Sequence, residues 1–146
     1  MRYLIIILAS LILVGCAATT SKKLNEVSFD IKAGESAIFI GAQEKILTSF
    51  TPPIKVHINN NDVGTLSSGE ILKYLVNTEL NQITANVPIP NRCYVPEDAI
   101  LKINPNQKKF LVIDKMYLGP GATFMCAQVG FKITEVSEDQ FLKVFR

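Results

Sequence analysis

The sequence lacks the short motifs that identify common hydrolase, nucleotide and metal sites. It contains no Gly-x-Ser-x-Gly, no phosphate-binding glycine loop, no His-Glu-x-x-His and no Asp/Asn calcium loop with the needed spacing. The one histidine, His57, falls on the expected polar face of a strand, which favours an ordinary exposed side chain over a catalytic base. The acidic pairs Glu97-Asp98 and Glu138-Asp139 are adjacent in sequence, so neither pair faces one site as an acid and a base must. We therefore predict that the protein is not an enzyme and holds no metal or cofactor.

A marked excess of positive charge is also missing. The 146 residues include 15 Lys and Arg against 13 Asp and Glu, a formal net charge of +2. Domains that bind nucleic acid usually carry a basic patch, because contacts to phosphates supply much of the affinity. The balanced charge therefore predicts no nucleic-acid partner.

A long apolar run occurs only at the N-terminus, from Leu4 to Leu13, directly after Arg2 and Tyr3. A helix that spans a bilayer needs roughly 20 predominantly apolar residues, so this run is too short for a permanent span. A short positive flank followed by an apolar run of this length is typical of a signal peptide. The sequence therefore predicts export.

The residues Leu13-Val14-Gly15-Cys16 resemble the lipobox of bacterial lipoproteins. The resemblance implies a signal peptide at residues 1–15, cleavage before Cys16, and acylation of that cysteine. Several acyl chains would hold the protein on a membrane, because each buried CH₂ group contributes about 0.8 kcal/mol. In such proteins a residue like Ala17 after the cysteine implies transport to the outer membrane, most simply to its periplasmic face. The alternatives are a secretory signal in which Cys16 is incidental, and a cytosolic protein with a buried N-terminus.

The mature chain divides into a tether and a folded part. Residues 16–24 are small or polar and show no periodicity, so they are expected to connect the lipid to the fold. Residues 25–146 are enough for one domain with a core but short for two. We predict a single folded domain.

The two other cysteines are Cys93 and Cys126, in a chain expected to enter an oxidising compartment. We predict that they form a disulfide, which by chain entropy would stabilise the fold by about 3 to 4 kcal/mol. The alternative is a pair of buried thiols. Two isolated cysteines and one histidine do not have the spacing of a zinc site.

Apolar residues of the mature chain recur mostly at period two, in short runs bounded by Gly, Pro and Asn, as in half-buried strands. Because no helical pattern separates these runs, they predict an all-β antiparallel sandwich, or a small barrel, with a short C-terminal helix. The predicted strands are Ser36 to Gly41, Ile54 to Asn59, Val63 to Leu66, Ile71 to Val76, Gln82 to Val87, Ala99 to Asn104, Lys108 to Leu118 and Thr123 to Val136.

Two local predictions are specific. Residues 59–62 read Asn-Asn-Asn-Asp, which tolerates left-handed backbone and predicts a hairpin turn. At the C-terminus, Ser137 as N-cap and Gln140 as its capping-box partner predict the start of a helix. The predicted packing stripe of that helix comprises Phe141, Leu142 and Phe145.

The stretch from Ile54 to Val76 combines a strand, an Asn/Asp turn, Val63-Gly64-Thr65-Leu66, a Ser-Gly step and an aromatic-bearing strand. It resembles small bacterial lipoprotein domains with a transthyretin-like sandwich. The resemblance implies the same β class.

The segment from Val87 to Pro96 contains three prolines, which keep a chain extended. Its side chains Ile89, Arg92 and Tyr94 are candidates for contact with a partner, since aromatic residues and Arg are enriched in interfaces. The alternative is a crossover between two sheets that Cys93 fixes in place.

These features favour a membrane-anchored envelope lipoprotein that binds another envelope protein without catalysis, for example as an accessory subunit of a secretion, pilus or surface assembly. The alternative is a small-ligand-binding protein or minor hydrolase with a pocket between the sheets, since ligand sites are usually concave and largely apolar.

The anchor gives the first testable prediction. Cys16→Ser should abolish fatty-acid labelling of the protein and leave the precursor uncleaved, because the acyl acceptor is removed. Labelled palmitate and the electrophoretic mobility of the product measure both effects, and Cys93→Ser is the matched control that should keep its label. Unchanged labelling of the Cys16→Ser variant would contradict the lipoprotein interpretation.

Overall fold

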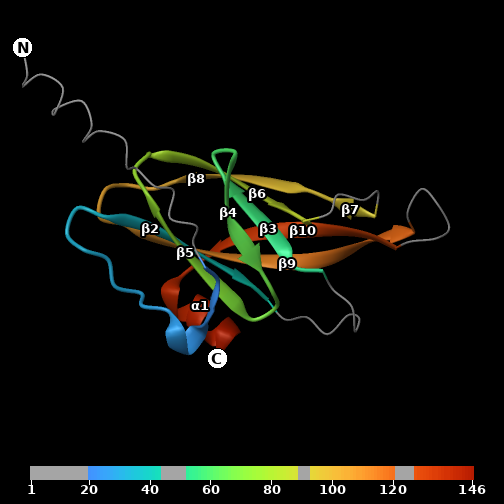
Figure 1. The fold of residues 1–146 in the computed structure, drawn as a ribbon, viewed down its shortest axis with the longest axis horizontal. Helices are drawn as coiled ribbons and strands as arrows, with labels where there is room; N and C mark the ends of the chain where they lie inside the picture. Colours follow the sequence, from blue (N-terminus) through green and yellow to red (C-terminus); the bar gives the residue numbers. More distant parts are fainter. Residues whose placement is uncertain (1–19, 44–51, 89–92, 121–126) are drawn as a thin grey trace, which may run out of the picture.

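The computed structural model describes residues 20–43, 52–88, 93–120 and 127–146, which form two β-sheets and one short helix (Figure 1). The predicted all-β sandwich with a C-terminal helix is confirmed. The elements are β1 (Lys22–Lys23), a 3-10 turn (Leu24–Glu26), β2 (Ser36–Ala42), β3 (Ile54–Ile58), β4 (Asn61–Leu66), β5 (Glu70–Val76), β6 (Leu80–Asn86), β7 (Tyr94–Val95), β8 (Glu97–Lys102), β9 (Lys108–Pro120), β10 (Ala127–Val136) and α1 (Glu138–Phe145).

The larger sheet has the strand order β1-β5-β2-β9-β10-β7, and the smaller has the order β4-β3-β6-β8. Two pairs in the larger sheet, β2 with β9 and β10 with β7, are parallel, so this sheet is mixed where an antiparallel one was expected. Parallel neighbours need long connections. The chain meets this need by building the whole smaller sheet between β2 and β9.

The inner core lies between the two sheets and follows the predicted alternation. On β3, Ile54, Val56 and Ile58 are buried, while Lys55 and His57 face away from the core. Residues from the larger sheet complete this core, among them Ile38, Leu111 and Phe131. Side chains of both sheets therefore meet in one apolar layer.

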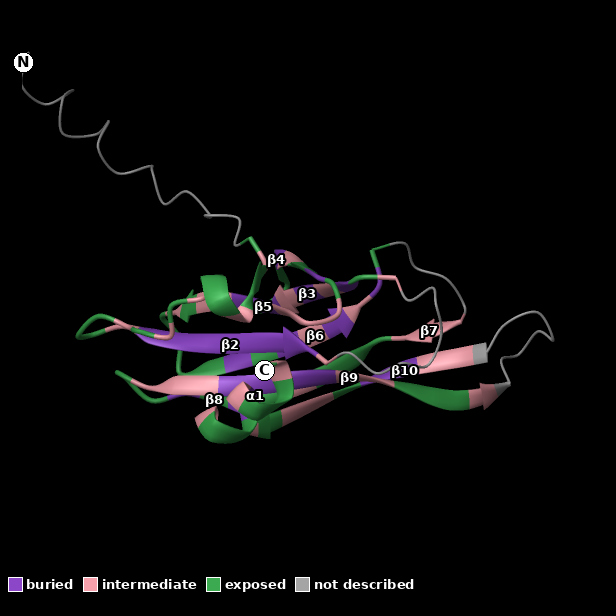
Figure 2. Cartoon of the chain, turned by 90° about the horizontal axis from the view of Figure 1, so that it is seen from below, coloured by how far each residue is buried: buried purple, intermediate pink, exposed green. Residues whose placement is uncertain are grey.

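A second, aromatic core covers the other face of the larger sheet. The Phe39 and Phe110 rings stack with their centroids 5.1 Å apart. The ring of Phe141 from α1 lies 5.3 Å from Phe110, and the ring of Phe29 from the N-terminal segment lies 4.9 Å from Phe39. Because both faces are covered, β2 is buried along its whole length (Figure 2). This burial explains why its sequence is a continuous apolar run.

Helix α1 begins with the predicted capping box. The backbone N–H of Gln140 donates to Ser137 Oγ at 3.3 Å, and the N–H of Ser137 donates to Gln140 Oε1 at 3.1 Å. Phe141 is fully buried, and Phe145 packs on the same aromatic core. Within the part of the chain that the structure describes, no helix has the length and hydrophobicity to cross a bilayer.

The hairpin of β3 and β4 turns through two residues, Asn59 and Asn60, with φ angles of 52° and 65°. Only a few residue types accept such angles, and asparagine is one of them. The turn lies where it was predicted, although β4 begins at Asn61, earlier than expected. Beside the turn, Lys55 forms a salt bridge of 2.8 Å with Asp62, and this hydrogen bond helps to lower the pKa of Asp62.

Strand β1 was not predicted. Lys22 and Lys23 pair with Ile71 and Glu70 of β5, so the folded part begins before residue 25, its expected start. Burial alone would raise the pKa of Glu70, but hydrogen bonds from the Ser67 backbone and the Ser21 hydroxyl lower it. The carboxylate of Glu70 therefore fixes the end of the tether to the loop before β5.

The packing of α1 on β2 gives the second prediction. A Cβ added at Gly41 would meet the ring of Phe145, so Gly41→Ala should lower the free energy of unfolding by about 1–3 kcal/mol through overpacking. In a Phe145→Ala background the same change should cost nothing, since the ring is gone and glycine is itself unfavourable in a strand. Urea unfolding of the four proteins of this cycle measures both values. An equal cost of Gly41→Ala in both backgrounds would show that the contact is not the cause.

Candidate functional site

The structure describes only some of the residues that the sequence analysis selected as candidates. Cys16, Ile89, Arg92 and Cys126 lie outside the described residues. Among the described ones, the search for a site therefore starts from Tyr94 and from side chains that the sequence analysis did not select.

The side chain of Tyr94 is more buried than that of a projecting contact residue would be. It belongs to β7, which pairs with β10 so that Tyr94 lies opposite Val129. Its ring stacks on Phe131 with the centroids 6.4 Å apart, and burial raises the pKa of its hydroxyl. Tyr94 thus packs partly on the inner core, which agrees with the alternative interpretation of its segment as a connection between the sheets.

Three of the seven large apolar residues that are exposed in the described part of the chain follow one another on the last part of β9. Met116, Tyr117 and Leu118 are consecutive and 37%, 62% and 48% exposed. They lie in what we call the ribbon, residues 115–120 of β9 paired with residues 127–131 of β10. The sequence analysis placed these residues in a strand but gave them no role, although three large apolar residues in a row, where alternation is expected, were the available signal.

The ribbon exists because β9 is longer than β2. Strand β2 ends at Ala42, opposite Ile113, while β9 continues to Pro120. Beyond that point β9 pairs with β10 alone among the described strands, and the ribbon extends past the sandwich (Figure 1). Leu118 packs over Gly130, where a Cβ would collide with it, whereas Tyr117 lies opposite Val129. Both faces of the ribbon therefore carry apolar side chains.

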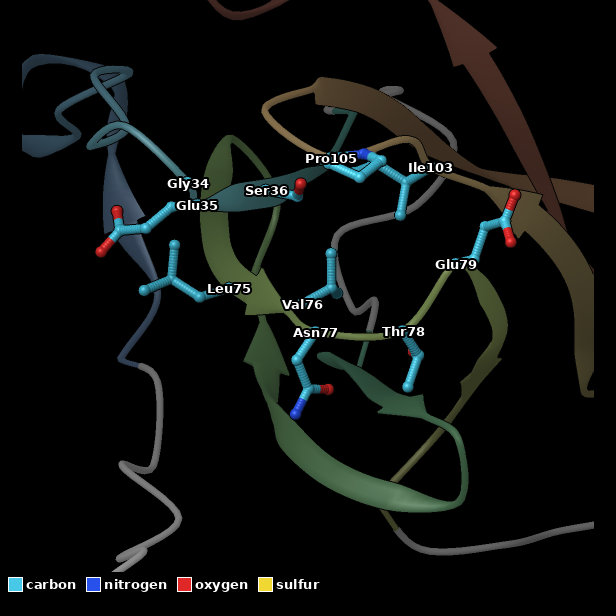
Figure 3. Close-up of a pocket in the computed structure, with 10 residues that line it drawn as sticks. All are labelled: Gly34, Glu35, Ser36, Leu75, Val76, Asn77, Thr78, Glu79, Ile103 and Pro105. Atoms are coloured by element: carbon cyan, nitrogen blue, oxygen red, sulfur yellow. The ribbon is translucent and has the colours of Figure 1, made fainter.

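A surface hollow of about 570 Å³ lies at another end of the sandwich (Figure 3). It is bordered by the start of β2, the end of β5 and the turns near Thr78 and Pro105. Both carboxylates at its border already have partners: Glu79 forms a salt bridge of 3.0 Å with Lys102, and Glu35 accepts a hydrogen bond from the Lys32 backbone. The hollow therefore presents no unengaged acid and base pair.

His57 lies on the outer face of the smaller sheet. It is half-buried on the outer side of β3, opposite Asp62 on one neighbouring strand and Thr84 on the other. Among the described residues, no three His, Cys, Asp or Glu side chains are grouped so that they could hold a metal ion. The hydroxyl of Thr84, the neighbour of His57 on β6, donates a hydrogen bond to Asp98.

No protein-family model matches the chain, and comparison with curated proteins and with solved structures finds no match either. The resemblances to lipoproteins and to transthyretin-like domains therefore stay predictions.

The strand β7 generates the third prediction, which concerns the cysteines. The backbone N–H of Val129 donates to the carbonyl of Cys93 at 2.7 Å, so Cys93 lies beside the first residues of β10, and Cys126 directly precedes that strand in sequence. Peptide mapping of the mature protein without reductant should show Cys93 linked to Cys126. Replacing both by serine should lower the free energy of unfolding by about 3–4 kcal/mol. Free thiols at both positions in protein taken from the periplasm would contradict the pairing.

Proposed function

We propose that the protein is an envelope lipoprotein, anchored through acylated Cys16 at the periplasmic face of the outer membrane, that binds another envelope protein without catalysis. The observation that carries the protein-binding part is the exposed apolar end of the ribbon. Met116, Tyr117 and Leu118 present aromatic and flexible apolar side chains on both of its faces. Tyr and Met are enriched in protein interfaces, and tyrosine often dominates their affinity.

The alternative, a ligand-binding protein or minor hydrolase, has less support. The hollow near Thr78 has a volume that a small ligand would need, but its carboxylates are engaged by the protein itself. The space between the sheets, where the sequence analysis expected a pocket, contains the closely packed inner core. These features favour protein binding over ligand binding or hydrolysis.

One of the predicted contact residues, Tyr94, lies beside the same surface. Tyr94 follows Arg92 by two positions and pairs with β10 at Val129, which is part of the ribbon. The ribbon and β7 therefore belong to one end of the larger sheet. We include Ile89 and Arg92 in the proposed contact surface on the basis of this sequence proximity.

The fourth prediction tests this surface in living cells. A photoreactive phenylalanine analogue at position 117 should give one discrete protein adduct on irradiation, because Tyr117 is exposed at the centre of the apolar run. The same analogue at Ile100, which is 80% exposed on β8, is the control and should give none. Mass spectrometry identifies the adduct.

The adduct should also be lost in a Met116→Ser, Leu118→Ser background and kept in His57→Ala. The contrary result would be that His57→Ala abolishes the envelope phenotype, while the Met116→Ser, Leu118→Ser variant loses the adduct but stays active. The ligand-binding or enzyme alternative would then replace the protein-binding proposal.

A further inference from the structure

The position of β1 limits how far the domain can move from its anchor. Because Lys22 already pairs with β5, only the six residues from Cys16 to Ser21 separate the lipid from the sheet. Even fully extended, six residues span about 20 Å. The Ser21 hydroxyl, which donates to Glu70 Oε2 at 2.9 Å, holds the last of them on the fold.

The register of β1 gives the direction in which the tether leaves. Lys23 pairs with Glu70 and Lys22 with Ile71, so residues before Lys22 run toward the C-terminal end of β5. In agreement, Thr20 and Lys73 border the same surface hollow, of about 430 Å³. The chain therefore leaves the sheet on the side of Lys73 and Leu75.

The ribbon lies toward the opposite end of the same sheet. Ala37 pairs with Leu75 on one side and with Lys108 on the other, so Leu75 is level with the start of β9. Tyr117 is nine residues further along β9, which corresponds to about 30 Å along the strand. The tether begins at Lys22, which the pairings of Ile71, Gly41 and Val112 place level with Val112, and it runs from there away from Tyr117.

The surface around the tether has the chemistry of a membrane contact. Lys22 and Lys23 are exposed, and neither forms a salt bridge with a described residue. Leu75 is 51% exposed on the same sheet. Lysines attract anionic headgroups by about 1 kcal/mol each near the surface, and an apolar side chain favours the boundary with the acyl chains.

We propose that the edge of the larger sheet along which the tether leaves, formed by Lys22 and Lys23 of β1 and by Leu75 of β5, rests on the bilayer that holds Cys16. The ribbon with Tyr117 then points away from that bilayer. This orientation rests on the proposed function, since it requires the acyl anchor. The orientation also identifies which surface of the protein contacts the lipid. The lipid in question is a phospholipid bilayer with anionic headgroups.

The absence of tryptophan from the sequence allows a direct test, the fifth prediction. The acylated mature protein, purified from membranes, carries a single tryptophan as Leu75→Trp or as Tyr117→Trp. Each is reconstituted into vesicles of phosphatidylethanolamine and phosphatidylglycerol that contain a lipid with a spin-labelled headgroup. Quenching of tryptophan emission by the spin label should be several-fold stronger at position 75 than at position 117.

A longer tether is the control for the physical cause. A Gly-Ser insert of about ten residues before Thr20 adds about 33 Å of contour, so the difference between the two positions should shrink. Lys22→Glu with Lys23→Glu should reduce quenching at position 75 without reducing flotation of the protein with the vesicles.

The outcomes separate the two proposals. Failure of the protein to float with vesicles would remove the anchor and with it the orientation. Flotation with equal quenching, or with stronger quenching at position 117, would overturn the orientation and leave the proposed function intact.

Discussion

The architecture depends on the need to cover both faces of β2. This strand is buried along its whole length, with Ile38 and Ile40 facing the smaller sheet and Phe39 facing the other way. A sheet with two apolar faces needs a layer on each, because exposed aromatic rings cost free energy in proportion to their area. The smaller sheet supplies one layer. The second comes from the two ends of the folded chain, through Phe29 and Phe141.

The same constraint explains why the sandwich is asymmetric. Where β2 runs beside β9, both faces of the larger sheet are covered, and β9 shows buried residues on both sides, such as Leu111 and Val112. Beyond the end of β2, Phe131 and Tyr94 still pack on the inner core, but residues 116–118 of β9 become exposed. The apolar ribbon is thus a direct result of a difference in strand length. A protein that exposes such residues without a partner incurs a risk of aggregation, which is why apolar surface of this kind usually marks an interface.

The sequence predicted those features that depend on local physics. Period-two alternation located β3, the paired asparagines located its turn, and Ser137 with Gln140 located the start of α1. It did not predict the parallel pairing of β2 with β9, since the pattern of a strand does not encode the direction of its neighbour. It missed β1 because Lys22 and Lys23 have no apolar pattern and pair only through the backbone. Met116 to Leu118 were not selected as a site because their exposure depends on where β2 ends.

The dependence of β2 on the C-terminal helix has a consequence for the order of folding. Phe141 and β9 are made long after β2, so the aromatic face of β2 has no complete cover until both are available. Pairings between distant segments also form slowly, because the chain must close a long loop first. Until β9 and α1 have been made, β2 therefore lacks two of the segments that bury it.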